Sequence, residues 1–141
     1  MKVAYNACFG GFELSPLGLT EFAKRKGIDL FWYEQVGYKH NNDEKYDRID
    51  GIPTENSISL YPLISDHGDV IYEIPDTFYY PSFHDESSRI DNDLIMVIES
   101  LGESANGMCA DLRIAEIPDD SEFEITYYDG NESVVPPRPS W

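Results

Sequence analysis

The first forty residues alternate between hydrophobic and polar positions in a way that predicts a strand, a loop, a helix and a second strand. Residues 2–6 alternate as a short strand does, and a glycine-containing loop follows them. Ser15 is a suitable helix N-cap, Pro16 fits the first helical position, and Gly27 follows the last turn as a stop signal. Residues 28–36 then form two alternating rows rich in aromatic side chains, which is typical of a strand.

The middle of the chain is more polar and its pattern is less regular. Residues 39–56 contain clusters of turn-forming residues, which predict a long loop. Residues 57–64 and 69–74 are candidate strands, and Pro62 confines the first of them to a sheet edge. The aromatic-rich run 78–84 is interpreted as a loop that its rings hold against the rest of the molecule.

Apolar residues at helical spacing predict a second helix. Its N-cap is Asp91 or Asn92, and Gly102 ends it. Residues 105–108 are a candidate for one more helical turn. The apolar stripe, at positions i, i+3, i+4 and i+7, consists of Leu94, Val97, Ile98 and Leu101.

The last third of the chain contains the strongest strand signal. Residues 109–117 alternate up to a proline, and residues 123–128 alternate in the same way. The Asp129-Gly130 pair stands where a two-residue hairpin turn is expected, before a last strand over residues 131–135.

These elements together predict an α+β fold. We expect one domain over residues 1–141, with a mostly antiparallel sheet of about five or six strands and two main helices packed on it. A chain of 141 residues, 41% of them hydrophobic, is long enough to bury one real core.

The charge is strongly negative and unevenly distributed. The formal net charge is −17, with 27 acidic against 10 basic residues. Residues 1–42 hold five basic and four acidic side chains, a net charge of +1, and residues 43–141 hold the remaining −18. Such a balance argues against direct binding of nucleic acid or of an anionic membrane, and it favours basic proteins as partners. Self-association stays open.

The two cysteines and the ends of the chain indicate a cytoplasmic protein. Cys8 and Cys109 each adjoin an alanine in an apolar stretch, which favours reduced, packed thiols over a disulfide framework. We expect no signal peptide and no membrane span, because no apolar run is long enough for either. The sequence indicates no cofactor.

The loop before the first helix is a candidate anion site. Free backbone N–H groups and the positive end of the helix dipole point the same way at such a place. The functional interpretation is a pocket for a polar or phosphorylated small molecule; the alternative is a tight turn that merely reverses the chain. The residues that would approach the ligand are Asn6, Cys8, Gly10, Gly11 and Ser15.

Other candidate sites each have a simpler structural explanation. Cys8 would be a nucleophile if a histidine lay near it, but a cysteine between Ala7 and Phe9 is usually an apolar filler. The acidic rows near residues 119–132 would imitate a nucleic-acid backbone, or are ordinary solvated strand faces. Three histidines have acidic neighbours suited to a metal, but without a metal-site spacing: His40, His67 and His84.

Three blocks of sequence are distinctive. The first block is Met1 to Phe12 followed by Ser15; the second runs from Arg89 through Asp93-Leu94, Glu99, Gly102, Ala105, Gly107 and Cys109-Ala110 to Ile114 and Glu116-Ile117-Pro118-Asp119; the third is Tyr128-Asp129-Gly130-x-Glu132, with Arg138 and the terminal Trp141. Together they resemble a family of small, largely uncharacterised proteins encoded by bacteriophages. The tail departs from the family's pattern, because Pro137-Arg138-Pro139-Ser140-Trp141 stands where a His-Arg-Thr-Trp ending is expected.

The resemblance implies a phage accessory protein that acts stoichiometrically in the host cytoplasm, with counter-defence as one such role. We expect it to sequester a nucleotide-like ligand in a pocket that the glycine loop forms with Arg89, Tyr128, Arg138 and Trp141. Arg138 would pair with a phosphate, and Trp141 or a tyrosine would stack on a base. The alternative is an acidic blocker of a basic host protein, and a third possibility is a small enzyme with a cysteine or metal site.

Overall fold

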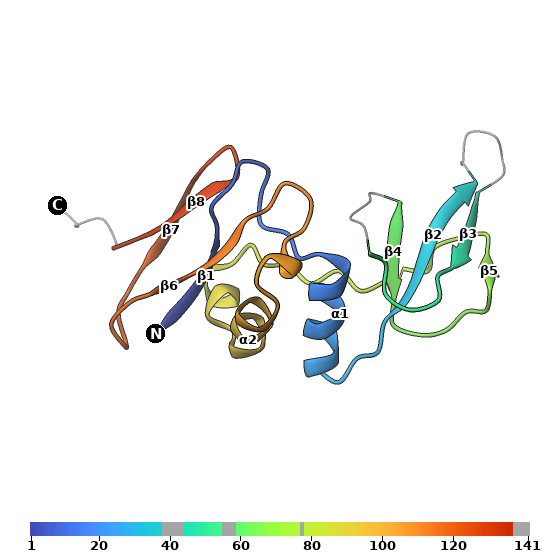
Figure 1. Ribbon diagram of the computed structural model, residues 1–141, viewed down its shortest axis with the longest axis horizontal. Helices are drawn as coiled ribbons and strands as arrows, with labels where there is room; N and C mark the ends of the chain where they lie inside the picture. Colours follow the sequence, from blue (N-terminus) through green and yellow to red (C-terminus); the bar gives the residue numbers. More distant parts are fainter. Residues whose placement is uncertain (38–43, 55–58, 77, 137–141) are drawn as a thin grey trace.

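The structure is a computed structural model and describes residues 1–37, 44–54, 59–76 and 78–136. Two groups of short strands lie on opposite sides of helix α1 (Pro16–Arg25), as Figure 1 shows. One group lies beside helix α2 (Asn92–Leu101), and the other consists of strands β2 to β5. The expected α+β class is confirmed.

Helix α1 begins and ends where the sequence predicts. The Ser15 side chain accepts a hydrogen bond from the Gly18 N–H at 3.0 Å, and Pro16 occupies the first turn. Lys26 is the C-cap, and Gly27 follows it with φ of +82°, a conformation that favours glycine. These signals are local to the chain, and for that reason sequence reasoning finds them.

Helix α2 confirms the second helix. Asp91 caps it by accepting hydrogen bonds from the N–H groups of Asp93 and Leu94, and Gly102 is its C-cap. A short 3-10 helix, η2 (Glu86–Ile90), precedes it. Another, η3 (Gly102–Ala105), follows at once, so the extra helical turn comes slightly earlier than the predicted residues 105–108.

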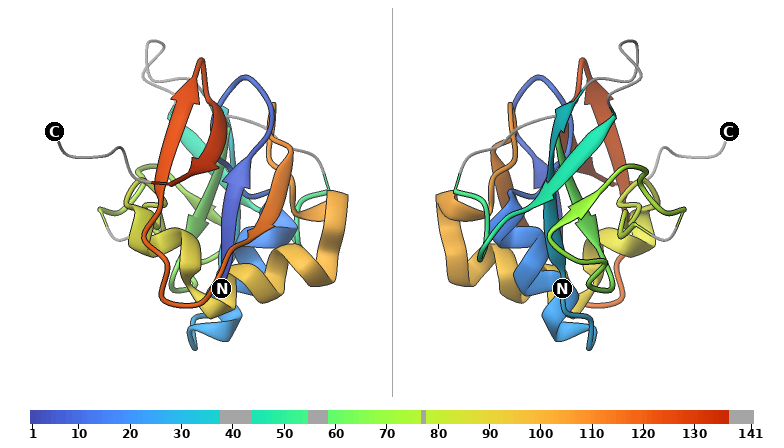
Figure 2. Two further views of the ribbon diagram at one scale, coloured as in Figure 1. Left: turned by 90° about the vertical axis from the view of Figure 1, so that its left-hand side faces the viewer. Right: turned by 90° about the vertical axis from the view of Figure 1, so that its right-hand side faces the viewer.

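Four strands form one layer beside α2. Strand β1 (Lys2–Asn6) pairs antiparallel with β6 (Leu112–Glu116), and β7 (Glu124–Tyr128) pairs with β8 (Asn131–Val135). Strand β8 lies next to β1 without a backbone ladder between them, as the two views of Figure 2 show. In the hairpin turn, Asp129 and Gly130 have φ of +49° and +85°, which confirms the predicted two-residue turn.

The other group is a four-stranded antiparallel sheet in the order β4-β2-β3-β5. Its strands are β2 (Phe31–Gly37), β3 (Lys45–Arg48), β4 (Leu60–Leu63) and β5 (Val70–Ile71). Pro62 lies on β4, at the sheet edge, as the sequence predicts.

Two details of the predicted strands are corrected. Residues 39–56 are not all loop, because β3 lies among them; three of its four side chains are polar, so its one buried residue, Tyr46, leaves no alternating pattern. Within the described residues, eight strands form three small sheets rather than one sheet of five or six. The N-terminal unit contributes to this division, because β1 pairs with β6 while β2 joins the four-stranded sheet beyond α1.

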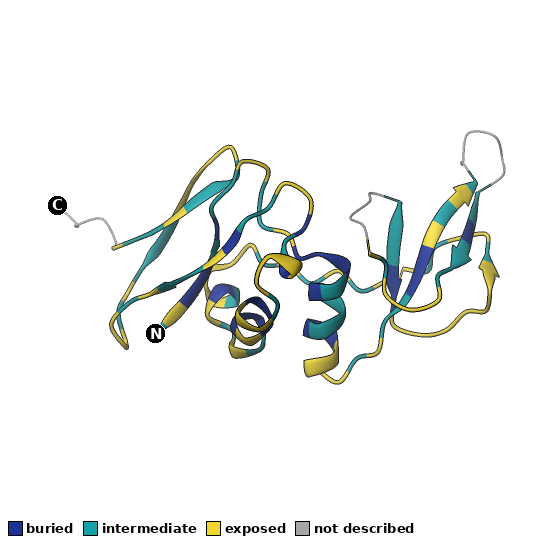
Figure 3. Ribbon diagram, in the orientation of Figure 1, coloured by how far each residue is buried: buried dark blue, intermediate teal, exposed yellow. Residues whose placement is uncertain are grey.

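The hydrophobic core has two parts. The larger part lies between α1, α2, β1 and β6, where Figure 3 shows buried positions on the facing sides of the helices. Its most buried members include Ala4, Leu94 and Ala105. The smaller part lies in the four-stranded sheet and consists of Tyr33, Tyr46 and Leu63 with neighbouring partly buried side chains. That the two parts form a single domain stays a prediction.

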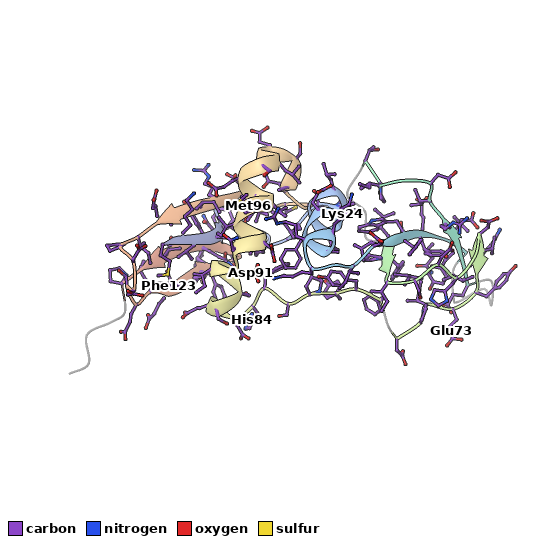
Figure 4. All side chains as sticks on the ribbon, turned by 90° about the horizontal axis from the view of Figure 1, so that it is seen from below. Lys24, Glu73, His84, Asp91, Met96 and Phe123 are labelled. Atoms are coloured by element: carbon purple, nitrogen blue, oxygen red, sulfur yellow. The ribbon has the colours of Figure 1, made fainter. Side chains whose placement is uncertain are left out.

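Ion pairs connect the end of α1 to the start of α2. Lys26 Nζ lies 2.8 Å from Asp91 Oδ2 and 2.8 Å from Asp93 Oδ2, and Figure 4 shows Asp91 at the amino end of α2 beside α1. The hydrogen bond from Lys26 holds the pKa of Asp93 below its usual value. Partial burial by itself raises the pKa of Asp91, but hydrogen bonds from Lys26 and from the Leu94 N–H outweigh it and lower that pKa.

Replacing Lys26 by methionine should therefore destabilise the protein in a pH-dependent way. Carboxylates with a lowered pKa in the folded state stabilise the fold above their unfolded pKa of about 4 and lose this effect as the pH falls. We expect Lys26→Met to melt at a lower temperature than the unsubstituted protein at pH 7, and the gap to close below about pH 3. Thermal melts followed by circular dichroism measure this. Lys24→Met is the matched control, and an equal effect of the two substitutions at pH 7 would contradict the prediction.

Candidate functional site

A pocket of about 700 Å³ lies where α1, the β7–β8 hairpin and the edge strand β4 approach one another. It is mostly apolar, and segments far apart in the sequence contribute to it. The hairpin lies on one side of α1, and β2 and β4 lie on the other (Figure 1). The side chains around it include Phe12, Glu13, Leu14, Pro16, Leu19, Trp32, Leu60, Pro62, Tyr80, Phe83, His84, Arg89, Tyr127 and Glu132.

Aromatic rings form much of the pocket wall. Trp32 is almost fully buried, and its ring is fixed by a hydrogen bond of 2.9 Å from Nε1 to Thr20 Oγ1. Phe12 and Phe83 contact one another with ring centroids 5.4 Å apart. Tyr80 and Tyr127, by contrast, are 81% and 71% exposed. The pocket thus combines fixed rings on its inner side with freely accessible rings at its mouth.

Arg89 and Glu132 form a buried ion pair beside this pocket. Their side chains are 5% and 10% exposed, and Arg89 Nη2 lies 2.8 Å from Glu132 Oε2 while Nη1 lies 2.5 Å from Oε1. Arg89 Nε donates to the Phe83 carbonyl at 2.6 Å, and the guanidinium carbon stands 3.9 Å from the centre of the Phe12 ring. The charge of Arg89 is therefore already compensated inside the protein, and a ligand phosphate would have to compete with Glu132.

Asn6 is fully buried and satisfies its side chain entirely within the backbone around it. Its Nδ2 donates to the carbonyls of Cys8 and Gly130 at 2.8 Å each, and its Oδ1 accepts from the Asp111 N–H at 2.8 Å. Its own N–H donates to Glu132 Oε1 at 2.8 Å. Asn6 thus joins β1 to the hairpin and to the start of β6.

The glycine loop packs directly against the hairpin turn. The Gly10 N–H donates to the Asp129 carbonyl at 2.9 Å. A Cβ on Gly130 would lie 2.4 Å from Gly11 N and 2.7 Å from Gly10 N, and one on Gly10 would lie 2.6 Å from the Cβ of Cys109. Gly10 and Gly130 are thus required for close approach, which favours the structural explanation of the loop. A Cβ on Gly11 would meet open space, and Gly11 borders the pocket whereas Gly10 does not.

Ser15 lies on the far side of the glycine loop from this network. Besides capping α1, its Oγ donates to the Ser104 carbonyl at 2.5 Å, and its N–H donates to the Ala105 carbonyl at 2.8 Å. The start of α1 is therefore hydrogen-bonded to η3. Ser15 does not border the large pocket, although Pro16 and Leu19 of the same helix do.

The remaining predicted site residues lie in different places, and the described ones do not gather at the pocket. Cys8 is half-buried; Cys109 is exposed, so the prediction that both thiols are packed is wrong for Cys109, which ends a loop with φ of +61°. Tyr128 is exposed and contacts the edge of Phe9 rather than bordering the pocket. Arg138 and Trp141 lie outside the described residues.

Sequence reasoning missed most of the pocket wall. The pattern predicts a strand at Trp32 and a packed loop at Phe83, and nothing local to either segment shows that both border one pocket. The richness of residues 78–84 in aromatic rings was the one available signal. His84 borders the pocket and lies below Asp91 in Figure 4, whereas His40 is outside the described residues.

The pocket border carries two carboxylates and two basic side chains, Arg89 and His84. Besides Glu132, it includes Glu13, and within the described parts of the chain no hydrogen bond or ion pair of the Glu13 carboxylate is found. Partial burial raises the pKa of Glu13. The same parts of the chain hold no group of three or more His, Cys, Asp or Glu side chains arranged to bind a metal ion. They also hold no helix long and apolar enough to cross a membrane.

No family model, curated protein or solved structure matches the chain significantly. The resemblance to bacteriophage proteins stays a prediction, and the functional argument rests on the geometry of the pocket.

Replacing Glu132 by glutamine should be strongly destabilising. It leaves the buried Arg89 charge uncompensated, and removing one partner of a buried ion pair costs about 3–5 kcal/mol. Urea unfolding of Glu132→Gln against the exposed Glu122→Gln control measures the loss. A cost within about 0.5 kcal/mol of the control, typical of surface substitutions, would show that the pair is not a structural constraint.

Replacing Gly130 by alanine should cost more than the same change at Gly51. The two glycines have φ of +85° and +81°, so both substitutions carry the penalty of about 1–2 kcal/mol for a left-handed residue. A Cβ at Gly51 meets open space, whereas one at Gly130 meets the Gly10-Gly11 backbone. The difference in unfolding free energy isolates the close approach, and equal costs would contradict it.

Proposed function

We propose that the protein is a non-catalytic binding protein for a small ligand that contains an aromatic ring, of about the size of a nucleoside, held in the pocket between α1, β4 and the hairpin. The observation that carries the proposal is the aromatic wall built from Trp32, Phe83, Tyr80 and Tyr127. The resemblance to phage proteins is what suggests sequestration of a host signal, and that part of the proposal rests on the resemblance alone.

The dimensions and lining of the pocket support this function. A volume of about 700 Å³ falls inside the range of about 300–1,000 Å³ that small-molecule sites occupy. Such sites are mostly apolar with a few polar groups, as here, where Ser82, Glu13 and His84 interrupt the apolar lining.

The arrangement of the rings supports a flat ligand. Aromatic side chains bind ring systems by offset stacking or edge contacts, and stacking on a base contributes about 1–3 kcal/mol per ring. Trp32 is already fixed by Thr20, so its ring is held in place before binding. The exposed rings of Tyr80 and Tyr127 would lose water-accessible surface when a ligand covers them.

The polar groups near the pocket support binding rather than reaction. Arg89, Glu132 and Asn6 are paired with one another or with backbone groups. Groups held in this way maintain the shape of a site. In the proposed function these polar groups therefore shape the pocket, and the aromatic rings contact the ligand.

A ligand screen tests the proposal. Nucleosides, nucleobases and other ring-containing metabolites should raise the melting temperature of the full chain, because a ligand that binds the folded state stabilises it. For a ligand found in this way, Tyr127→Ala should raise the dissociation constant by about fivefold or more. This corresponds to the loss of one stacking contact of at least about 1 kcal/mol. Isothermal titration calorimetry measures the constant.

Tyr72→Ala is the matched control, because Tyr72 is 70% exposed but lies away from the pocket. A flat response to the whole panel at millimolar concentration would contradict the proposed function. So would a ligand whose affinity falls equally in the Tyr72 and Tyr127 variants, because its site would then lie elsewhere.

A further inference from the structure

We propose that the pocket selects its ring-containing ligands by charge: it prefers those that carry a positively charged amine and disfavours those that carry a phosphate. This inference rests on the proposed function and adds to it the chemical class of the ligand. It departs from the expectation, implied by the family resemblance, of a nucleotide-like ligand in a pocket that includes Arg89.

Arg89, the arginine that borders the pocket in the described part of the chain, is already neutralised. Glu132 binds the Arg89 guanidinium through both carboxylate oxygens, and the Phe83 carbonyl accepts from its third nitrogen. Both side chains are at least nine-tenths buried, so the pair contributes almost no net charge to the space beside it. A phosphate would gain little from Arg89 unless it displaced Glu132, at the cost of leaving a buried carboxylate unpaired.

Glu13 lies at the border of the pocket. A Cβ added on Gly107 would lie 2.6 Å from Glu13 Cγ and 2.8 Å from Glu13 Cβ, so the base of the Glu13 side chain packs closely on Gly107. The Glu13 carbonyl also accepts from the Gly107 N–H at 2.8 Å. The backbone and first side-chain carbons of Glu13 are therefore fixed, and because Glu13 is exposed its carboxylate is accessible to a ligand.

Aromatic ring faces attract cations. The protein already uses this contact, because the Arg89 guanidinium lies over the Phe12 ring and Lys26 Nζ lies 5.4 Å from the centre of the Phe22 ring. Several rings together with a carboxylate are the usual surroundings of a bound organic ammonium group. The net charge of −17 adds a long-range attraction for cations and a repulsion for phosphates.

His84 is the other basic side chain at the border, and it is exposed. The backbone N–H of His84 donates to Ser82 Oγ at 3.4 Å. The comparison of ligands is best made at pH 7.5, where aliphatic amines are mostly protonated.

Two matched ligand series test the charge preference on the full-length protein. The first is 5′-amino-5′-deoxyadenosine, adenosine and adenosine 5′-monophosphate, which share one ring system. The second is tryptamine, tryptophol and indole-3-propionate. In each series calorimetry should show the amine binding at least about fivefold tighter than the neutral compound, and the anion at least about fivefold weaker, as expected for one partly screened charge contact.

Glu13→Gln should remove most of the advantage of the amine and leave the affinity of the neutral compound within about twofold. Glu122→Gln, which removes an exposed carboxylate away from the pocket, should leave the order of affinities unchanged. If the anion binds as tightly as the neutral compound, or the amine gains nothing, charge selection is overturned while ring binding stands. If no member of either series binds, the proposed function fails as well.

Discussion

The buried pair of Arg89 and Glu132, together with Asn6, is the constraint on which the rest of the structure depends. Strands β1 and β8 lie side by side without a backbone ladder, so their relative position is fixed by side chains: Glu132 accepts from the Asn6 N–H and from Arg89. A buried charge pair tolerates little displacement, because either partner left alone inside the protein is costly. The pair therefore sets where the hairpin stands relative to β1 and η2.

The pocket is a consequence of that placement. With the hairpin fixed, Gly130 closes against the glycine loop, and Tyr127 is directed to the space beside α1. Phe12 lies under the Arg89 guanidinium and contacts Phe83, so the same arginine orders two rings of the pocket wall. Polar residues thus supply the geometry here, and apolar residues supply the binding surface.

The sequence predicts what is local and misses what depends on distant contacts. Ser15, Asp91 and the Asp129-Gly130 turn act on their immediate neighbours, so the two helices and the hairpin follow from the sequence. Strand β3 and the division into three sheets depend on pairing between segments that the pattern does not specify. The candidate site shows the same limit. Asn6, Gly10, Gly11 and Arg89 do lie close together, but as a structural network, and the rings beside them come from other elements.

The two-part core has a thermodynamic consequence for any ligand. Leu14 and Leu19 pack with the larger core, whereas Trp32, Leu60 and Pro62 lie on the strands that carry the smaller one. The pocket exists as a site when both parts are folded, so a bound molecule contributes its free energy to both at once. Occupancy would then make the unfolding of the two parts more nearly simultaneous. The ligand would then bury apolar surface of both β4 and α1 and so connect the two parts of the core.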